Sequence, residues 1–110
     1  METTQQPNKL VAVISYITII GLLIAIVLNQ NEKNDFASFH IKQSLGLTLT
    51  SLVVYFIGVI PVIGWIISLI GSIFILILWV IGLINAISGN QKPVPVLGDK
   101  FLEWFKDLGL

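Results

Sequence analysis

The chain has 110 residues, of which 55% are hydrophobic and 11% are charged, and its formal net charge at pH 7 is zero. This composition is far more apolar than that of a soluble domain, so we expect one small membrane domain. Six lysines and no arginine face six acidic residues, a balance that excludes nucleic acid as a partner. The lack of cysteine excludes disulfides, thiolate metal sites and cysteine nucleophiles.

The N-terminal region predicts a short tail followed by a first membrane span. Residues 1–9 are polar and contain Pro7, which predicts a disordered tail. The uncharged run from Leu10 to Leu28 is long enough, as a helix rising about 1.5 Å per residue, to cross the hydrocarbon core. A cleaved signal peptide is the alternative, but no small-x-small cleavage pattern follows this run. We expect the polar residues inside the span to bond to the helix backbone or to a neighbouring helix; they are Ser15, Tyr16 and Thr18.

A second stretch, between Lys42 and Lys92, contains no charged residue at all. As one helix it would reach roughly 70 Å, more than twice the thickness of a bilayer's hydrocarbon core, so it must fold back on itself. The break is expected at Pro61-Val62-Ile63-Gly64, because proline removes a backbone donor and glycine tolerates a turn. We therefore predict two further spans, 36–60 and 65–87. The first is capped by Asp35, begins outside the hydrocarbon and enters it around Ser44.

His40 is the only histidine, and Gln43 shares its face of the expected helix. One interpretation makes His40 a proton-titrating or substrate-contacting group with Gln43 as its hydrogen-bonding neighbour. We favour a structural role, in which His40 is solvated or bonds a lipid headgroup or a loop carbonyl, because no triad or metal partner accompanies it. We predict no metal site and no cofactor, since the nearby carboxylates of Glu32 and Asp35 lack helical ligand spacing.

Two further patterns concern packing and anchoring. Small residues recur along the third predicted span and form a face that another helix can approach closely, in this chain or in a second copy; they are Gly64, Ser68, Gly71 and Ser72. After an extended linker with two prolines, residues 99–108 are amphipathic and too short to span, which predicts a helix lying in the interface or packing on a protein partner. Aromatic residues are the expected interfacial anchors: Trp65, Phe101, Trp104 and Phe105.

The distribution of lysine predicts the orientation of the three spans. Five lysines lie in the first connection and the C-terminal tail, whereas only Lys9 lies on the other side. Because positive charge favours the inner side of a membrane, we expect the N-terminus outside and the C-terminus in the cytoplasm. The integral membrane protein would then sit in a prokaryotic plasma membrane.

Several segments together also resemble a known family. They are VAVISYI, FASFHIKQSLGL, IPVIGW, LWVIGLINAISG and KPVPVLGD. This combination resembles a widespread family of small, uncharacterised prokaryotic membrane proteins that is grouped with the chloroplast inner-envelope protein-import channel component. The resemblance implies a helical membrane domain connected with polypeptide passage or membrane-protein assembly. The plastid relatives have four spans, one more than we predict here.

These observations favour an all-α membrane protein that is not an enzyme. We expect a scaffold or translocation-related component that assembles through helix packing, with the lipid bilayer and either further copies or other membrane proteins as partners. The alternative is a small oligomeric channel or transporter whose path is lined by hydroxyl groups, of Ser15, Thr18, Thr48, Thr50 and Ser51. No nucleophile with a base, and no pair of carboxylates, points to catalysis.

Overall fold

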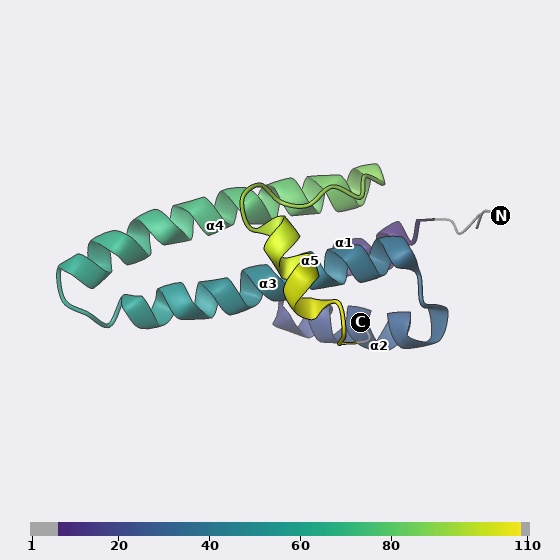
Figure 1. Ribbon diagram of the computed structural model, residues 1–110, viewed down its shortest axis with the longest axis horizontal. Coiled ribbons are helices and arrows are strands. Elements are labelled where there is room, and N and C mark those ends of the chain that lie inside the picture. Colours follow the sequence, from purple (N-terminus) through teal and green to yellow (C-terminus); the bar gives the residue numbers. More distant parts are fainter. Residues whose placement is uncertain (1–6, 109–110) are drawn as a thin grey trace.

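The computed structural model describes residues 7–108, and over this range every regular element is a helix, which confirms the all-α prediction. The predicted disordered tail falls largely on residues 1–6, outside the described residues. A long antiparallel hairpin runs the length of the molecule, and three shorter helices pack around one half of it (Figure 1). The helices are α1 (Lys9–Ile14), α2 (Ile19–Glu32), α3 (Asp35–Ile57), α4 (Ile63–Ser88) and α5 (Gly98–Phe105).

The long hairpin consists of α3 and α4, and the chain folds back at the Pro61 motif, where the sequence predicts it. Gly64 is buried in the first turn of α4. A methyl group added at Gly64 would lie only 2.2 Å from the carbonyl oxygen of Ile57, so a larger residue would push the two helices apart. The apolar hairpin therefore depends on glycine as well as proline at its tip.

The turn at the hairpin tip occurs a second time in the chain. Val62 and Val96 each follow a proline and have φ angles of 63° and 71°, in the left-handed region that β-branched residues rarely adopt. In both Pro61–Ile63 and Pro95–Leu97 the last residue's N–H donates to the proline carbonyl at 2.8 Å. This three-residue hydrogen-bonded turn reverses the chain sharply, and α4 and α5 begin directly after it.

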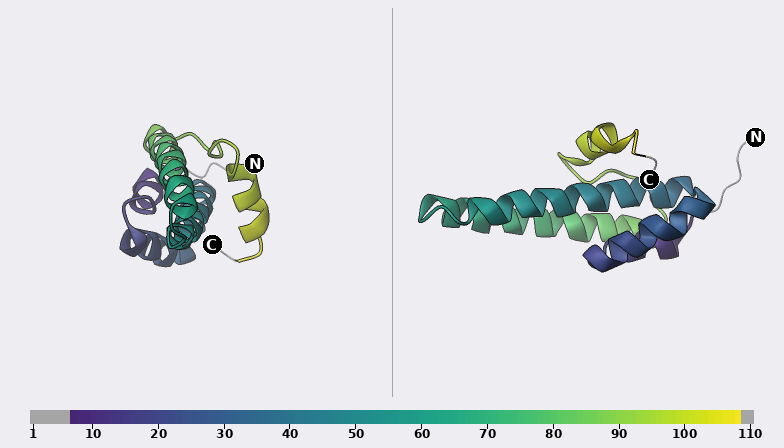
Figure 2. Two further views of the ribbon diagram at one scale, coloured as in Figure 1. Left: turned by 90° about the vertical axis from the view of Figure 1, so that its left-hand side faces the viewer. Right: turned by 90° about the horizontal axis from the view of Figure 1, so that it is seen from below.

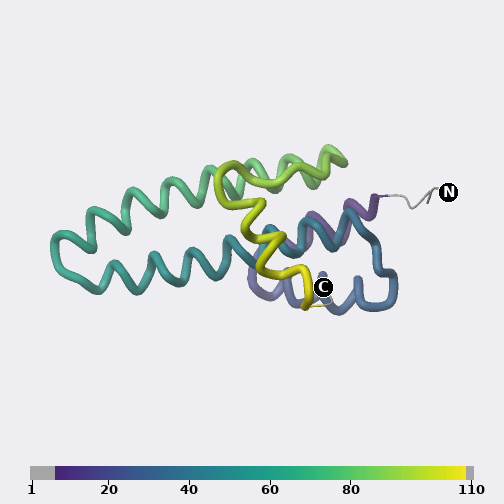
Figure 3. The backbone as a smooth tube through the Cα atoms, viewed as in Figure 1, coloured from purple at the N-terminus to yellow at the C-terminus, as the bar shows by residue number. Residues whose placement is uncertain are grey.

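The predicted first span over 10–28 is wrong, because the structure breaks this run into α1 and α2 and reverses its direction between them (Figure 3). The Thr18 hydroxyl caps α2 by accepting from the N–H of Gly21 at 3.1 Å. Gly21 also lets the two helices approach closely, since a methyl group there would lie 2.4 Å from the carbonyl oxygen of Ile14. The sequence shows an uninterrupted apolar run, but a capping hydroxyl followed by glycine allows it to turn.

The reversal places Asn8 beside the connection between α2 and α3. The Asn8 side-chain amide donates to both carboxylate oxygens of Glu32, at 2.8 and 2.7 Å, and its backbone N–H donates to the Asn34 side chain at 3.2 Å. Three spans would have placed Asn8 and this connection at opposite ends of the bundle. That expectation is wrong, and Lys9 therefore lies at the same end as the α2–α3 connection.

The structure supports fewer membrane spans than the sequence suggests. Within the described residues, α4 is the one helix long and apolar enough to cross a bilayer, with a mean hydropathy of 2.8 over its most apolar 18 residues. The apolar α2 is shorter, with 14 residues. The 23 residues of α3 begin with a polar third that contains His40 and Lys42. Three spans are therefore not confirmed.

The C-terminal helix α5 packs on α3, on the opposite side of the hairpin from α2 (Figure 2). It ends at Phe105, earlier than predicted. Phe101 is only 1% exposed and its ring lies over Gly46, where an added methyl group would be 2.2 Å from the ring. Phe101 is therefore not available as a lipid anchor, contrary to the prediction, and Phe105 is half-buried. Trp104 and Trp65 remain exposed, at 60% and 61%.

The stripe of small residues on α4 is used inside the hairpin. Gly71 packs against Val54 of α3, and a methyl group added at Gly71 would lie 3.2 Å from the Val54 side chain. Ser68 lies against Gly58 at the end of α3, and a methyl group added at Gly58 would lie 3.0 Å from the Ser68 hydroxyl. Ser72 is exposed and is not among these contacts. Most of this stripe therefore joins α4 to α3 within one chain, an arrangement that the sequence left open.

The reversal generates a prediction that suits a chain without native cysteine. Single cysteines replacing Pro7, Gln91 and Val59 report on the start of α1, the end of α4 and the hairpin tip. We expect Pro7→Cys and Gln91→Cys to react with a membrane-impermeant maleimide from the same side of sealed vesicles, because both lie at the end where Asn8 contacts Glu32. If Pro7→Cys and Val59→Cys were labelled from one side of the vesicles and Gln91→Cys from the other, the three-span topology would be restored.

Candidate functional site

The site begins at the first turn of α3, which is set by a pair of asparagines. Asn34 caps the helix by accepting from the Ala37 N–H at 3.0 Å, so the cap precedes Asp35, the predicted cap residue. The Asn34 N–H donates in turn to the Asn29 side chain at 2.9 Å, which joins the end of α2 to the start of α3. This fixed start places His40 on the face of α3 that is turned toward α1.

His40 is completely buried, contrary to a solvated or lipid-exposed position, and both of its ring nitrogens are hydrogen-bonded. Its Nε2 lies 2.9 Å from the carbonyl oxygen of Asn90, and its Nδ1 lies 2.8 Å from the Tyr16 hydroxyl. Because a carbonyl can only accept, Nε2 carries the proton and Nδ1 accepts from Tyr16. Phe36 and Phe39 present their rings edge-on to the imidazole. The arrangement suits the neutral form of the ring.

Burial lowers the pKa of His40 below its ordinary value of 6.5, because the charged imidazolium would lose its hydration. The hydrogen bond to the Asn90 carbonyl acts in the opposite direction and is the smaller effect. His40 precedes Lys42 and so lies outside the charge-free membrane segment. At neutral pH the ring is therefore uncharged.

Gln43, one turn along the same helix, holds the segment of residues 90–98, which we call the strap. Its side-chain nitrogen donates to the carbonyl oxygen of Gly98 at 2.9 Å, and its oxygen accepts from the N–H of Val94 at 2.8 Å. All of these groups are buried. Gln43 does not bond His40; each binds a different part of the strap, and together they fix where α5 begins.

The turn between α1 and α2 is bonded to both long helices. The Trp79 indole N–H donates to the Tyr16 carbonyl at 2.6 Å, and the Ser44 hydroxyl donates to the Ser15 carbonyl. A methyl group added at Gly82 would lie 2.7 Å from the Tyr16 ring, so this ring packs directly on α4. We call Tyr16, His40, Gln43 and Trp79 the polar latch, because these four side chains tie the turn, α3, α4 and the strap together.

The latch connects segments of the chain that are far apart in the sequence. Its polar groups bond one another or the backbone, with up to 63 residues between partners. Within residues 7–108, no three His, Asp or Glu side chains gather where they could hold a metal ion. A buried, fully bonded polar network of this kind specifies one arrangement of the surrounding helices.

Local patterns in the sequence pointed to three members of the latch but not to most of their partners. His40 and Gln43 were picked out by residue type and spacing, but their partners in the strap lie 50 or more residues away. The Tyr16 side chain, expected to bond its own helix backbone or a neighbouring helix, does bond His40 of α3, whereas the contact of Trp79 was not predicted. The one available signal was the cluster of polar residues from Ser15 to Thr18 in an otherwise apolar run.

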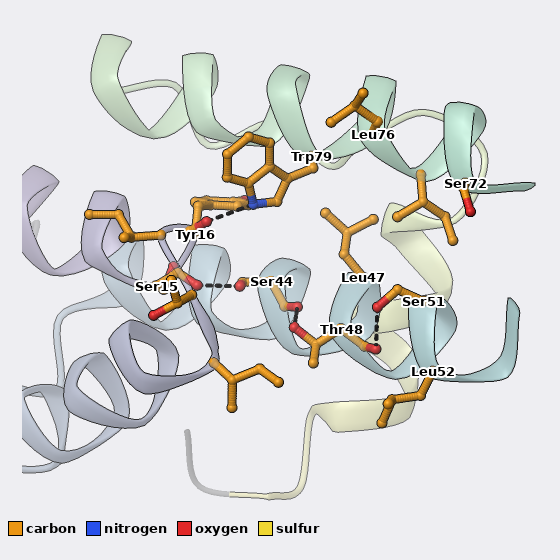
Figure 4. A pocket seen from close by; sticks show the side chains of 14 residues that line it. Ser15, Tyr16, Ser44, Leu47, Thr48, Ser51, Leu52, Ser72, Leu76 and Trp79 are labelled. Carbon is orange, nitrogen blue, oxygen red and sulfur yellow. Dashed lines mark hydrogen bonds between the residues drawn. The ribbon is translucent and has the colours of Figure 1, made fainter. Parts of the chain in front are cut away.

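A groove of about 340 Å³ opens beside the latch, where the α1–α2 turn meets α3 and α4 (Figure 4). Its walls carry apolar side chains and a row of hydroxyl groups from Ser15 to Ser51. Along α3, the Thr48 hydroxyl donates to the Ser44 carbonyl at 2.9 Å and the Ser51 hydroxyl to the Thr48 carbonyl at 2.7 Å. Both of these hydroxyls, which the sequence suggested as a channel lining, thus donate to their own helix.

The fold and the latch define a small all-helical membrane protein whose polar groups serve its architecture. The chain belongs to the magnetosome magnetite crystal formation protein family, MamF/MmsF, whose profile matches residues 7–102. It is 35% identical over 77 residues to the UPF0132 membrane protein of Methanocaldococcus jannaschii, a match that covers 69% of this chain and 55% of that relative. The chain thus spans about half the length of this relative. No solved structure matches the chain.

The comparisons correct the family inferred from the sequence. Neither the matching profile nor the archaeal relative points to the chloroplast inner-envelope import component or its grouping, so that resemblance is wrong. The segments that suggested it contain His40, Gln43, Pro61 and Gly64, which fix the latch and the hairpin turn. Residues with such architectural roles do not separate one family of helical membrane proteins from another. A membrane protein with a prokaryotic relative is what the comparisons support.

The two bonds of Gln43 to the strap generate a second prediction. Gln43→Met keeps the length of the side chain but removes the donor to the Gly98 carbonyl and the acceptor of the buried Val94 N–H. Each such loss costs about 1–3 kcal/mol, so we expect clear destabilisation in detergent and faster protease cleavage within 90–98. Gln91→Met, at an exposed position of the same segment, is the matched control. Equal cleavage of both variants would mean that Gln43 does not hold the strap.

The burial of His40 generates a third prediction, for the pH dependence of stability. The unfolded chain takes up a proton near pH 6.5 and the folded chain only at a lower pH, so stability is full above 6.5 and falls as the pH drops below it. The slope is at most about 1.4 kcal/mol per pH unit. Thermal unfolding between about pH 8 and 5.5, above the ordinary carboxylate range, measures it. His40→Gln should be less stable than the wild type, and its stability should not change with pH over this range. If the stability of the wild type depended on pH no more than that of this variant, the burial of His40 would be contradicted.

Proposed function

We propose that the protein is a non-enzymatic membrane scaffold that assembles inside the bilayer with copies of itself or with other membrane proteins. The observation that carries this proposal is the exposure of α4. Only 11% of its most apolar 18-residue stretch is buried within the chain, so nearly all of that surface faces lipid or another protein. Helices with so much free apolar surface can pack in a membrane without any change of fold.

The use of the polar side chains supports the same proposal. His40, the residue most suited to proton transfer, has both ring nitrogens bonded and is completely buried. Gln43 is also buried, and its bonds hold the strap. A group that acts on a substrate must be reachable by it, whereas these groups hold helices in place. The chain therefore offers partners a fixed surface.

The family description connects its members with the formation of magnetite crystals. For this chain we propose that any such connection acts through the membrane. The charged residues of α5 and of the α2–α3 connection lie on the half of the molecule around which the short helices pack, and the hairpin tip is apolar (Figure 1). Copies gathered in one bilayer would present this charged half as a common platform.

Energy transfer between labelled copies in lipid vesicles tests the scaffold proposal. Donor-labelled and acceptor-labelled chains are mixed and diluted with lipid at a constant ratio of the two labels. We expect transfer well above random mixing that falls as the lipid-to-protein ratio rises, and that unlabelled chain competes away. Transfer at the level of random mixing throughout, with no capture of other membrane proteins by in-cell crosslinking, would overturn the proposal.

A further inference from the structure

The hydroxyl-lined groove exists because the first apolar segment covers only part of the α3–α4 hairpin. The α1–α2 turn ends beside Ser44, and beyond it the faces of α3 and α4 are open. The open part is lined by Thr48, Ser51 and Ser72, all within the charge-free stretch between Lys42 and Lys92. Hydroxyl groups exposed at this position face lipid in a single copy, and lipid tails offer them no hydrogen bond.

The two walls of the groove differ in what they can bond. On the α3 wall, the hydroxyl hydrogens of Thr48 and Ser51 are already donated to backbone carbonyls, so their oxygens remain as acceptors. On the α4 wall, Ser72 is exposed, and within the described residues its hydroxyl has no hydrogen-bond partner. One wall therefore offers acceptors and the other offers a free donor, as the close-up shows (Figure 4).

We propose that this groove is the site where a second copy of the chain docks. The inference rests on the proposed scaffold function and names its surface. A two-fold axis along the membrane normal that passes through the groove turns the α4 wall of one copy toward the α3 wall of the other. Ser72 of each copy then donates to the Ser51 or Thr48 oxygen of its partner, and two equivalent hydrogen bonds form across the interface.

A second copy fits this groove better than a lipid chain does. An acyl chain would fill the apolar part, between Leu52 and Leu76, but would leave the donor on α4 and the acceptors on α3 unbonded. A second copy supplies both kinds of group at the same depth in the bilayer. The stripe of Gly64, Ser68 and Gly71 cannot serve instead, because it already packs α4 against α3.

Crosslinking between two cysteine variants tests the site, using a chain that has no cysteine of its own. Copies with Ser51→Cys and copies with Ser72→Cys carry different tags and are reconstituted together in vesicles. We expect an oxidant to join the two tags. The control pairs Ser51→Cys with Ile70→Cys, since Ile70 is exposed on α4 but points away from the groove. That pair should crosslink several-fold less.

The energy-transfer assay supplies a second readout with milder variants. Ser72→Ala should weaken self-association by roughly fivefold to tenfold, the effect of losing two membrane hydrogen bonds of ordinary strength. Ser88→Ala, at an exposed serine near the end of α4 outside the groove, should leave self-association unchanged. Both alanine variants keep the hairpin contacts, so membrane abundance should stay the same.

The outcomes separate the two proposals. Assembly in vesicles with equal crosslinking through Ser72→Cys and Ile70→Cys, or with Ser72→Ala unchanged, would overturn the groove as the interface and leave the scaffold standing. Random mixing in the energy-transfer assay would overturn the groove as the interface, and random mixing together with no membrane protein captured by in-cell crosslinking would overturn the scaffold as well. A chain that stays monomeric and retains one lipid, released by filling the groove with Ser51→Leu, would assign the groove to lipid.

Discussion

Tyr16 is the residue on which the arrangement of the helices depends. Its hydroxyl donates to His40, its carbonyl accepts from Trp79, and its ring lies on Gly82. One residue in the turn between α1 and α2 therefore contacts both long helices. These contacts compensate for reversing an apolar run that would otherwise cross the membrane, because the backbone groups freed at the break find partners in α3 and α4. With Tyr16 in place, His40 is oriented to bond the strap.

The reversal divides the molecule into two unlike halves. One half contains α1, α2, α5 and the polar latch, and its interior is specified by directional hydrogen bonds between distant segments. The other half is the end of the α3–α4 hairpin, which is held by close contacts at small residues such as Gly64 and Gly71. The first half sets where the helices lie, and the second leaves apolar surface for lipid or for another protein. The groove lies where the two halves meet.

Local signals in the sequence were sufficient for the hairpin but not for the latch. The Pro61 turn, the limits of α3 and α4 to within a few residues, and the amphipathic α5 all follow from proline, charge and periodicity. The reversal at Thr18 could not be predicted in this way, because a hydroxyl side chain inside an apolar run is equally compatible with a continuous membrane-spanning helix. The burial of Phe101 on Gly46 and the bonds of His40 and Gln43 to the strap depend on pairings across 50 or more residues, which no local pattern specifies.

The distance between residues 7 and 31 tests the reversal most directly. Spin labels at Pro7→Cys and Asn31→Cys lie at exposed positions on either side of the α1–α2 turn. With the chain reversed and Asn8 bonded to Glu32, electron–electron dipolar spectroscopy in lipid should give a short distance. Tyr16→Ala should broaden the distribution of distances between the two labels. A narrow distribution near 36 Å, the length of a straight helix over this interval, would contradict the reversal and the latch built on it.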